Sequence, residues 1–270
     1  MTPLRPLVLI GAGNMGGAVL RGWLANDIDA KSILVVDPSL SDEMAVELNA
    51  KGVKSCPTLP DGMIASVMML AIKPQMMEKV LPSLAVGTDD KTVIVSIAAG
   101  TTIKLIKSFL PHGIVVRSMP NTPAMIGRGI TGVVAEDTLS VDDMALVSLL
   151  LEVCGPVEWL NDEKLMDAVT AVSGSGPAYI FLLAEVMAIA GEKAGLAPDL
   201  AMRLARETVA GAGELLNCSA LSASTLRQNV TSPNGTTAAA LAVLMQDDAM
   251  QTIFTEAILA AKKRSEELAG

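Results

Sequence analysis

The chain is poor in aromatic residues and in histidine. Only 2% of its 270 residues are Phe, Trp or Tyr, and the single histidine, His112, lies between Pro111 and Gly113. The hydrophobic share is still 51%, so a core must be built from Ala, Val, Leu, Ile and Met. One histidine cannot form a multi-histidine metal cluster, and its proline and glycine neighbours predict a surface turn.

Cysteine and basic residues are also scarce. The three cysteines, at positions 56, 154 and 218, are odd in number and lack the spacing of a zinc site. This pattern argues against a disulfide framework and favours a reducing, cytoplasmic location. Lys and Arg number 20 against 29 Asp and Glu, and the formal net charge is −9. The sequence therefore predicts no metal site and lacks the basic surface of a nucleic-acid-binding protein.

Long apolar runs are absent. The most apolar stretch, Ala178–Ala190, is interrupted by Glu185 and preceded by Gly176 and Pro177. It is shorter than the roughly 20 apolar residues that a transmembrane helix needs. We therefore expect no membrane association and predict a helix buried inside the fold or in a dimer.

The first half alternates short β-rich segments with helical patterns. Helices are predicted between the strands, for example over Gly16–Ala25, Asp42–Ala50 and Ile103–Leu110. Strand–helix alternation predicts a doubly wound parallel sheet, and strands that are apolar throughout fit a sheet buried on both faces. This domain is expected over residues 1–161. Its candidate strands are Leu7–Ile10, Ile33–Val36, Val67–Ile72, Val93–Ile97, Ile114–Arg117 and Thr131–Ala135.

The pattern changes after Asn161, where strand-like segments give way to Ala-rich helical periodicity. We expect an all-α C-terminal domain over residues 162–270, without a long linker before it. Asp162 is placed to cap the first helix, and Pro177 and Pro198 suit the first turns of the next two. The predicted helices are Glu163–Val172, one opening at Pro177, one from Pro198 towards Cys218, Ser224–Val230, Thr236–Gln246 and Ala249–Leu268.

A glycine-rich motif, Gly11-Ala12-Gly13-Asn14-Met15-Gly16, follows the first strand and opens the first helix. A G-x-G-x-x-G in this context is typical of Rossmann-type dinucleotide binding. Gly11 permits the tight turn, Gly13 lets the backbone approach the pyrophosphate, and Gly16 lets the helix pack on the sheet. The phosphates are expected at the helix N-terminus, where N–H groups and the helix dipole favour anions. A plain glycine-rich turn in an α/β domain is the alternative.

Asp37 ends the second strand, at about the 20-residue spacing after the motif expected of a ribose-binding carboxylate. Such a carboxylate accepts hydrogen bonds from the ribose hydroxyls of NAD and repels a 2′-phosphate. Ser39 could instead donate to a phosphate, and no arginine is adjacent in the sequence. The residues themselves lean towards NAD, and NADH and NADPH both remain open.

Three further segments lie at predicted carboxyl ends of strands, the edge where α/β sheets bind ligands. They are Ala71-Ile72-Lys73-Pro74, Ser96-Ile97-Ala98-Ala99-Gly100 and Arg117-Ser118-Met119-Pro120-Asn121-Thr122-Pro123. We expect Ala71, Lys73, Pro74, Ala98 and Ala99 to border the cofactor. For Lys73 the alternative is an ordinary surface lysine.

Two more motifs lie in the helical half. They are Ala171-Val172-Ser173-Gly174-Ser175-Gly176-Pro177-Ala178-Tyr179 and Leu226-Arg227-Gln228-Asn229-Val230-Thr231-Ser232-Pro233-Asn234-Gly235-Thr236-Thr237. With these in place, the chain resembles the pyrroline-5-carboxylate reductase family over nearly its whole length. One departure is Asn234, where the family usually has the first of two glycines. Asparagine tolerates positive φ better than most residues, so the turn is expected to survive.

The resemblance implies reduction of 1-pyrroline-5-carboxylate, a cyclic imino acid, to L-proline by NADPH or NADH, the last step of proline biosynthesis. It places Asn229 at the cofactor and the Thr237 hydroxyl beside the imine nitrogen, as proton donor or as hydrogen-bond partner. It also implies a homodimer with interlocked helical domains, and leaves a larger ring of dimers open. The substrate-binding residues expected are Ser175, Val230, Ser232, Gly235, Thr236 and Thr237.

The Ser232–Thr237 segment also suits an anion by its own chemistry. Backbone N–H groups at the expected helix start, with the hydroxyls of Ser232 and Thr236, can bind a carboxylate. The alternative is that Thr236 and Thr237 only cap the helix.

Two other functions are weighed against imine reduction. A β-hydroxyacid dehydrogenase uses a lysine one helical turn after a glycine-rich stretch such as Ser173–Gly176, and Pro177–Leu182 contains none. A non-catalytic protein that senses the nicotinamide redox state would need the glycine motif but not the Ser232–Thr237 segment.

Overall fold

The structure is a computed structural model that describes residues 6–269. The chain forms two compact units. The first contains the residues up to Gly174 and those from Ala261 onward, and the second is Ser175–Ala260. The domain boundary between residues 161 and 162 stays a prediction, and the two units are described separately below.

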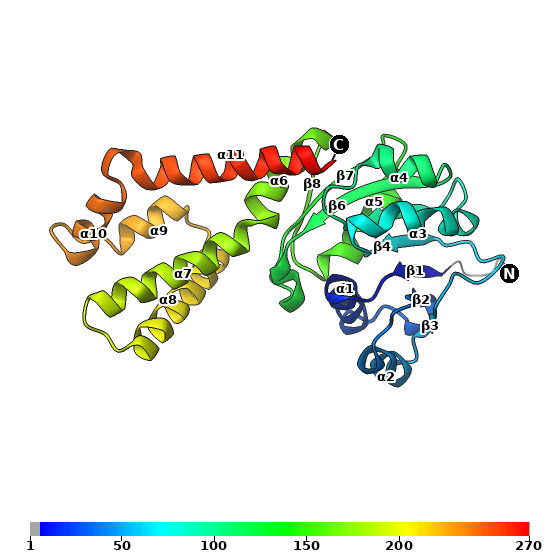
Figure 1. Ribbon diagram of the computed structural model, residues 1–270, viewed down its shortest axis with the longest axis horizontal. Helices are drawn as coiled ribbons and strands as arrows, with labels where there is room; N and C mark the ends of the chain where they lie inside the picture. The colour runs from blue at the N-terminus through cyan, green and yellow to red at the C-terminus, as the bar shows by residue number, and fades with distance from the viewer. Residues whose placement is uncertain (1–5, 270) are drawn as a thin grey trace. The chain divides into compact units, whose positions relative to one another are not determined.

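The first unit is built on an eight-stranded sheet in the order β3-β2-β1-β4-β5-β6-β7-β8 (Figure 1). Neighbouring strands are parallel except for the antiparallel pair β6–β7. The expected doubly wound sheet is therefore confirmed, with one antiparallel step. The strands are β1 Leu7–Ile10, β2 Ile33–Val36, β3 Lys54–Cys56, β4 Val67–Leu70, β5 Val93–Ser96, β6 Ile114–Pro120, β7 Thr131–Ala135 and β8 Val157–Trp159.

The antiparallel step has a simple cause. A parallel neighbour requires a crossover connection of a dozen or more residues, usually a helix. Between Pro120 and Thr131 the chain forms only the short 3₁₀ helix η4, Thr122–Ile126, so β7 runs back beside β6. The predicted parallel sheet therefore contains one antiparallel pair.

Alternate residues of each central strand face opposite layers of helices. Leu7 and Leu9 belong to the hydrophobic cluster that includes the buried Trp23, whereas Val8 and Ile10 belong to the cluster that includes Met77. The first cluster is formed with α1 Asn14–Ala25, α2 Asp42–Lys51 and α5 Val141–Glu152, and the second with α3 Met77–Leu84 and α4 Ile103–Phe109. Both faces of the sheet are therefore covered, as expected of a doubly wound fold.

The helical segment after β8 is divided into short pieces. Asp162 caps it as predicted, accepting the Lys164 N–H at 2.9 Å. The single helix predicted to Val172 was wrong, because a π-helix interrupts the α-helical hydrogen bonding. The pieces are the 3₁₀ helix η5 Glu163–Leu165, α6 Met166–Val169 and the π-helix η6 Thr170–Gly174.

The second unit is made of helices that leave much apolar surface exposed. Its buried hydrophobic residues, among those described, are Ala188, Ala201 and Ala205. The stretch Glu163–Lys193 is long and apolar enough to cross a membrane by composition alone, and 6% of its most apolar window is buried. The helices of this unit are α7 Gly176–Lys193, α8 Pro198–Cys218, α9 Ala223–Asn229, α10 Thr236–Leu244 and α11 Ala249–Ala269, which ends in the first unit.

Candidate active site

The three motif glycines occupy three different environments at the end of β1. Gly11 has φ +89, donates its N–H to the Val36 carbonyl at 2.9 Å, and an added Cβ would lie 2.8 Å from the Ala71 carbonyl oxygen. An added Cβ on Gly16 would strike the Gly11 carbonyl oxygen, whereas one on Gly13 would meet no described atom within 4 Å. The loop is thus closed at both ends and open at Gly13, which fits the approach of a dinucleotide pyrophosphate.

Asp37 is tied to this loop by its side chain. Its Oδ2 accepts the Ala12 N–H at 2.9 Å, and its Oδ1 accepts the Ser39 N–H at 2.8 Å. Each carboxylate oxygen retains accepting capacity, and the fixed orientation suits the ribose hydroxyls of a dinucleotide.

A cavity of about 330 Å³ lies beside Asp37. It brings together five predicted cofactor residues: Ala12, Gly13, Asn14, Asp37 and Ser39. Sequence analysis missed the other four lining residues, Arg21, Ser41, Glu43 and Met44. The periodicity of α1 could have placed Arg21 on the face that meets α2, but no arginine adjacent to Asp37 marked it.

Five further predicted cofactor residues follow β4, which neighbours β1 in the sheet, and β5, which neighbours β4. Ala71 donates its N–H to the Ile10 carbonyl at 2.8 Å, directly under the glycine loop. Lys73 and Pro74 are exposed just beyond β4, and beyond β5 Ala98 is buried and Ala99 is exposed. The structure brings these residues to the carboxyl edge of the sheet.

The middle of β6 carries a buried arginine that forms an ion pair with a partly exposed glutamate. Arg117 is 3% exposed, and its Nη1 lies 2.9 Å from Glu163 Oε1. The same carboxylate oxygen accepts the Ile103 N–H, also at 2.9 Å, at the start of α4. The partner offsets part of the cost of burying the guanidinium, and the shared carboxylate oxygen links β6, α4 and η5.

The Ser232–Thr237 segment joins α9 to α10 in the second unit. Asn234 has φ +59, so the left-handed turn expected of this asparagine is confirmed. The Gly235 N–H closes the turn on the Ser232 carbonyl at 3.0 Å. Asn229 and Val230, at the end of α9, are exposed.

The N-terminus of α10 is open to a ligand. Gly235 is its N-cap residue and makes no side-chain capping hydrogen bond, within the part of the chain that the structure describes. Ser232 and Thr236 are exposed and Thr237 is half-buried. Backbone N–H groups and three hydroxyls therefore gather at a helix start, an arrangement that binds carboxylates.

The Ser173–Pro177 motif divides between the two units. An added Cβ on Gly174 would lie 2.5 Å from Met119 Cε, so this glycine allows β6 and the π-helix to pack closely. Ser175 is half-buried at the start of α7, where its carbonyl accepts the Ala178 N–H at 3.0 Å. The lack of a side chain at Gly174 thus serves packing within the first unit.

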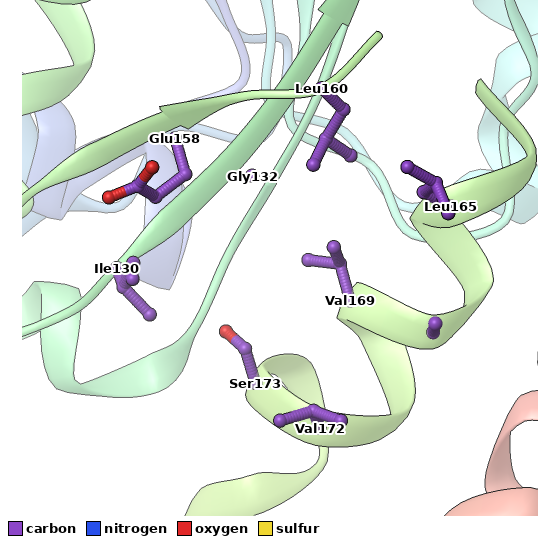
Figure 2. Close-up of a pocket in the computed structure, with 9 residues that line it drawn as sticks. Ile130, Gly132, Glu158, Leu160, Leu165, Val169, Val172 and Ser173 are labelled. Atoms are coloured by element: carbon purple, nitrogen blue, oxygen red, sulfur yellow. The ribbon is translucent and has the colours of Figure 1, made fainter. Parts of the chain in front are cut away.

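An apolar cavity of about 370 Å³ lies elsewhere in the first unit (Figure 2). In Figure 2, Val169 and Ser173 project from the helical segment towards Ile130, just before β7, and Leu160, just after β8. Its lining is almost wholly apolar, and Glu158 is the one charged residue among the described residues that line it. The lining residues are Ile130, Gly132, Glu158, Leu160, Leu165, Ala168, Val169, Val172 and Ser173.

The thiols and the histidine offer no nucleophile or base at these sites. Burial raises the pKa of the Cys154 thiol to about 11, and burial also raises the pKa of Cys56. His112 is exposed, with Nδ1 2.8 Å from Asp90 Oδ1. The described residues contain no group of three or more His, Cys, Asp or Glu that could hold a metal ion.

Two family models match the chain. Residues 163–268 match the model described as pyrroline-5-carboxylate reductase dimerisation. Residues 6–100 match the model described as NADP oxidoreductase, coenzyme F420-dependent. The two matched regions contain the α10 segment and the glycine-rich loop, respectively.

Curated relatives and solved structures agree with these models. The chain is 40% identical to a pyrroline-5-carboxylate reductase from Pseudomonas aeruginosa, covering 97% of this chain and 96% of the relative, and 39% identical to one from Haemophilus influenzae, covering 97% of each. It is similar to the structure of a pyrroline-5-carboxylate reductase from Coxiella burnetii, with TM-score 0.92, 35% identity and 99% coverage of each chain. The structure of the Plasmodium falciparum enzyme with NADP bound matches with TM-score 0.80, 26% identity and 98% coverage of each chain.

Proposed function

This chain belongs to the pyrroline-5-carboxylate reductase family, and from that membership we propose which of its residues bind the cofactor and the substrate. The chain reduces 1-pyrroline-5-carboxylate to L-proline by hydride transfer from NAD(P)H, the last step of proline biosynthesis. The observation that carries the assignment of residues is the uncapped helix start at Ser232–Thr237, with its positive-φ asparagine.

The glycine-rich loop and Asp37 hold the dinucleotide. The open backbone at Gly13 accepts the pyrophosphate, and Asp37 accepts hydrogen bonds from the adenosine ribose. Ala71, Lys73, Pro74, Ala98 and Ala99 border the rest of the cofactor along the sheet edge, and Asn229 is a further cofactor-binding residue. When bound, the nicotinamide supplies the hydride.

The start of α10 holds the substrate carboxylate. The N–H groups of its first turn and the hydroxyls of Ser232 and Thr236 act as donors, and the helix dipole adds to the attraction. Gly235 keeps this start free of a side chain, while Val230 and Ser175 border the substrate.

Thr237 hydrogen-bonds the imine nitrogen. Reduction adds a hydride to the imine carbon and leaves a proton on the nitrogen, so a hydroxyl at that atom either donates the proton or orients an imine that is already protonated. A threonine hydroxyl is a weak acid, and the pH profile of a variant separates these two roles.

Thr237→Val tests this assignment, because it removes the hydroxyl and keeps the shape. We expect kcat/KM for imine reduction to fall at least about tenfold, while the Kd of NADH, measured by calorimetry, is retained. Thr252→Val, the same change at an exposed threonine of α11, is the matched control. Unchanged turnover in Thr237→Val would remove this residue from the mechanism.

The chain oligomerises through the dimerisation module at residues 163–268. We propose the finer arrangement of a homodimer with interlocked helical domains, and a ring of such dimers as its extension. The support is the exposed apolar surface of α7, where the consecutive residues Ile180, Phe181 and Leu182 are 45%, 63% and 59% exposed. Consecutive residues point to different sides of a helix, so α7 is apolar around much of its circumference. A second copy would cover this surface and the apolar cavity of Figure 2, five of whose lining residues belong to the module.

The proposed dimer and the cysteine thiols support a soluble, cytoplasmic protein. An apolar helix covered by a second copy needs no membrane, and cysteines kept as thiols suit a reducing compartment. We also propose that the functional division lies between residues 161 and 162, as the start of the matched module at residue 163 supports.

Two alternative functions, a β-hydroxyacid dehydrogenase and a non-catalytic redox sensor, are distinguished by different observations. A β-hydroxyacid dehydrogenase lacks support, since the first turns of α7, over Pro177–Leu182, hold no lysine that could act as a base. A non-catalytic redox sensor would bind cofactor without turning over the imine, so turnover of the imine by the purified wild type would exclude it.

A further inference from the structure

The cavity beside Asp37 contains one basic side chain among its described lining residues. Arg21 projects from α1 into a lining that includes two carboxylates, Asp37 and Glu43, and two serines, Ser39 and Ser41. Arg21 is separated from Asp37 in sequence by the second half of α1 and all of β2, yet both line the same space. The question is which ligand group would bind a guanidinium in a cavity that also contains two carboxylates.

Glu47 of α2 holds this guanidinium from outside the cavity. Arg21 Nε donates to Glu47 Oε1 at 2.9 Å and Nη2 donates to Oε2 at 2.8 Å, a bidentate pair. Glu47 is not among the lining residues, and the pair does not use Nη1. Nη1 lies 3.6 Å from where a Cβ on Gly17 would stand, over the first turns of α1. One edge of the guanidinium is thus clamped, and the amino group Nη1 remains for a ligand.

The surroundings of Arg21 suit a phosphate attached to the adenosine ribose. Asp37 is fixed by the N–H groups of Ala12 and Ser39, which sets the place of the ribose. Ser41 is the N-cap of α2 and accepts the Met44 N–H at 3.2 Å, so the positive end of a ten-residue helix also faces this lining. A guanidinium, serine hydroxyls and a helix N-terminus are preferred phosphate partners.

We propose that Arg21, positioned by Glu47, binds the 2′-phosphate of NADPH and offsets the repulsion from Asp37 and Glu43. This proposal rests on the placement of the cofactor at the glycine-rich loop. The chain then uses Asp37 for the ribose of NADH and Arg21 for the extra phosphate of NADPH, and accepts both cofactors.

The test compares two probes that differ in the 2′-phosphate alone: adenosine 2′,5′-bisphosphate and adenosine 5′-monophosphate. Calorimetry gives the Kd of each for the wild type and for Arg21→Ala. We expect the wild type to bind the bisphosphate at least as tightly as the monophosphate. Arg21→Ala should raise the Kd of the bisphosphate about 10- to 100-fold, the size of a lost charge-assisted contact, and change the Kd of the monophosphate by less than about threefold.

Three further variants sharpen the comparison. Glu47→Gln keeps the Arg21 charge but loosens its position, and is expected to raise the bisphosphate Kd by about three- to tenfold, whereas Arg21→Lys should recover part of the loss. Lys79→Ala removes one positive charge from an exposed position of α3 and should leave both Kd values as they are.

Equal weakening of both probes by Arg21→Ala, or no weakening of either, overturns the proposal. A wild type that binds the monophosphate but not the bisphosphate overturns it too. Binding of neither probe defeats the placement of the cofactor itself, and the proposal with it. Selective loss of the bisphosphate in a chain that does not turn over the imine would support Arg21 and refute the proposed function.

Discussion

At the scale of single residues, the loop after β1 contains glycines that are needed for different reasons. Gly16 has no room for a side chain, because a Cβ would strike the Gly11 carbonyl oxygen and lie 3.0 Å from Ala71 Cβ. Gly13 has room, with φ −70 and no described atom within 4 Å of an added Cβ. Gly16 is therefore needed for the fold, and Gly13 is needed for the approach of the ligand.

This difference predicts opposite outcomes for two alanine substitutions. Gly16→Ala should lower the free energy of unfolding by about 1–3 kcal/mol, because helix α1 must shift to relieve the overlap. Gly13→Ala should leave the stability of the cofactor-free protein nearly unchanged but weaken cofactor binding about tenfold or more, because the methyl group occupies the approach of the pyrophosphate. Thermal denaturation and calorimetry with NADH measure the two effects. The reverse assignment of effects would contradict these roles.

Residue-level prediction from sequence succeeded where contacts are local. The Gly11–Gly16 motif and the positive φ of Asn234 follow from short-range backbone geometry, and both are present in the structure. Arg21 could not be found in this way, because its place beside Asp37 depends on how α1 packs against α2. The residues adjacent to Asp37 in sequence therefore give no sign of the arginine that lines the same cavity.

At the scale of elements, the segment between α9 and α10 depends on one left-handed residue. Asn234 has φ +59, a conformation that costs a β-branched residue roughly 1–2 kcal/mol and a glycine nothing. The turn it makes places Gly235 at the N-cap of α10, so the geometry of the proposed carboxylate site depends on it.

We therefore expect Asn234→Gly to keep kcat/KM within about threefold of the wild type and Asn234→Val to raise KM for the imino acid about tenfold. The Kd of NADH should change in neither variant, since the glycine-rich loop is untouched. Steady-state kinetics with each variant checks this. Equal KM values for both variants would show that the left-handed turn does not shape the substrate site.

The strands divide into those that a sequence pattern can predict and those that it cannot. β1, β2 and β7 have the predicted bounds, because four or five consecutive apolar or β-branched residues form each central strand. β3 and β8 are three residues long and only partly buried. Strands of this kind contain no run of apolar residues, so the sequence pattern did not predict them. The antiparallel course of β7 depends on the short connection between β6 and β7. The π-helix at Thr170–Gly174 packs closely against β6, a tertiary contact that the sequence pattern does not reveal.

At the scale of the whole molecule, the second unit exposes more apolar surface than a stable isolated unit would. Its buried hydrophobic residues, within the described range, are three alanines, while Phe181 and its neighbours on α7 are exposed. Exposed apolar faces of this extent mark protein interfaces. The sequence predicted the change to helices near residue 161. It does not determine which surface covers them, because in the proposed homodimer that depends on how two copies of the chain pack together.

This account predicts that Phe181→Glu disrupts the oligomer, because a buried unpaired carboxylate in an apolar interface costs several kcal/mol. Analytical ultracentrifugation should show a smaller species than the wild type. Val46→Glu, the same change at a residue of α2 that is 69% exposed, is the control and should keep the wild-type mass. An unaltered oligomer in Phe181→Glu would place the interface elsewhere.

The most direct test of the central claim is an assay of the purified protein with 1-pyrroline-5-carboxylate, run with NADH and NADPH in parallel. The loss of reduced cofactor is followed by absorbance and the proline formed is quantified. The account predicts that proline appears in a one-to-one ratio with oxidised cofactor, with both nucleotides. No turnover of the imino acid with either nucleotide would contradict it.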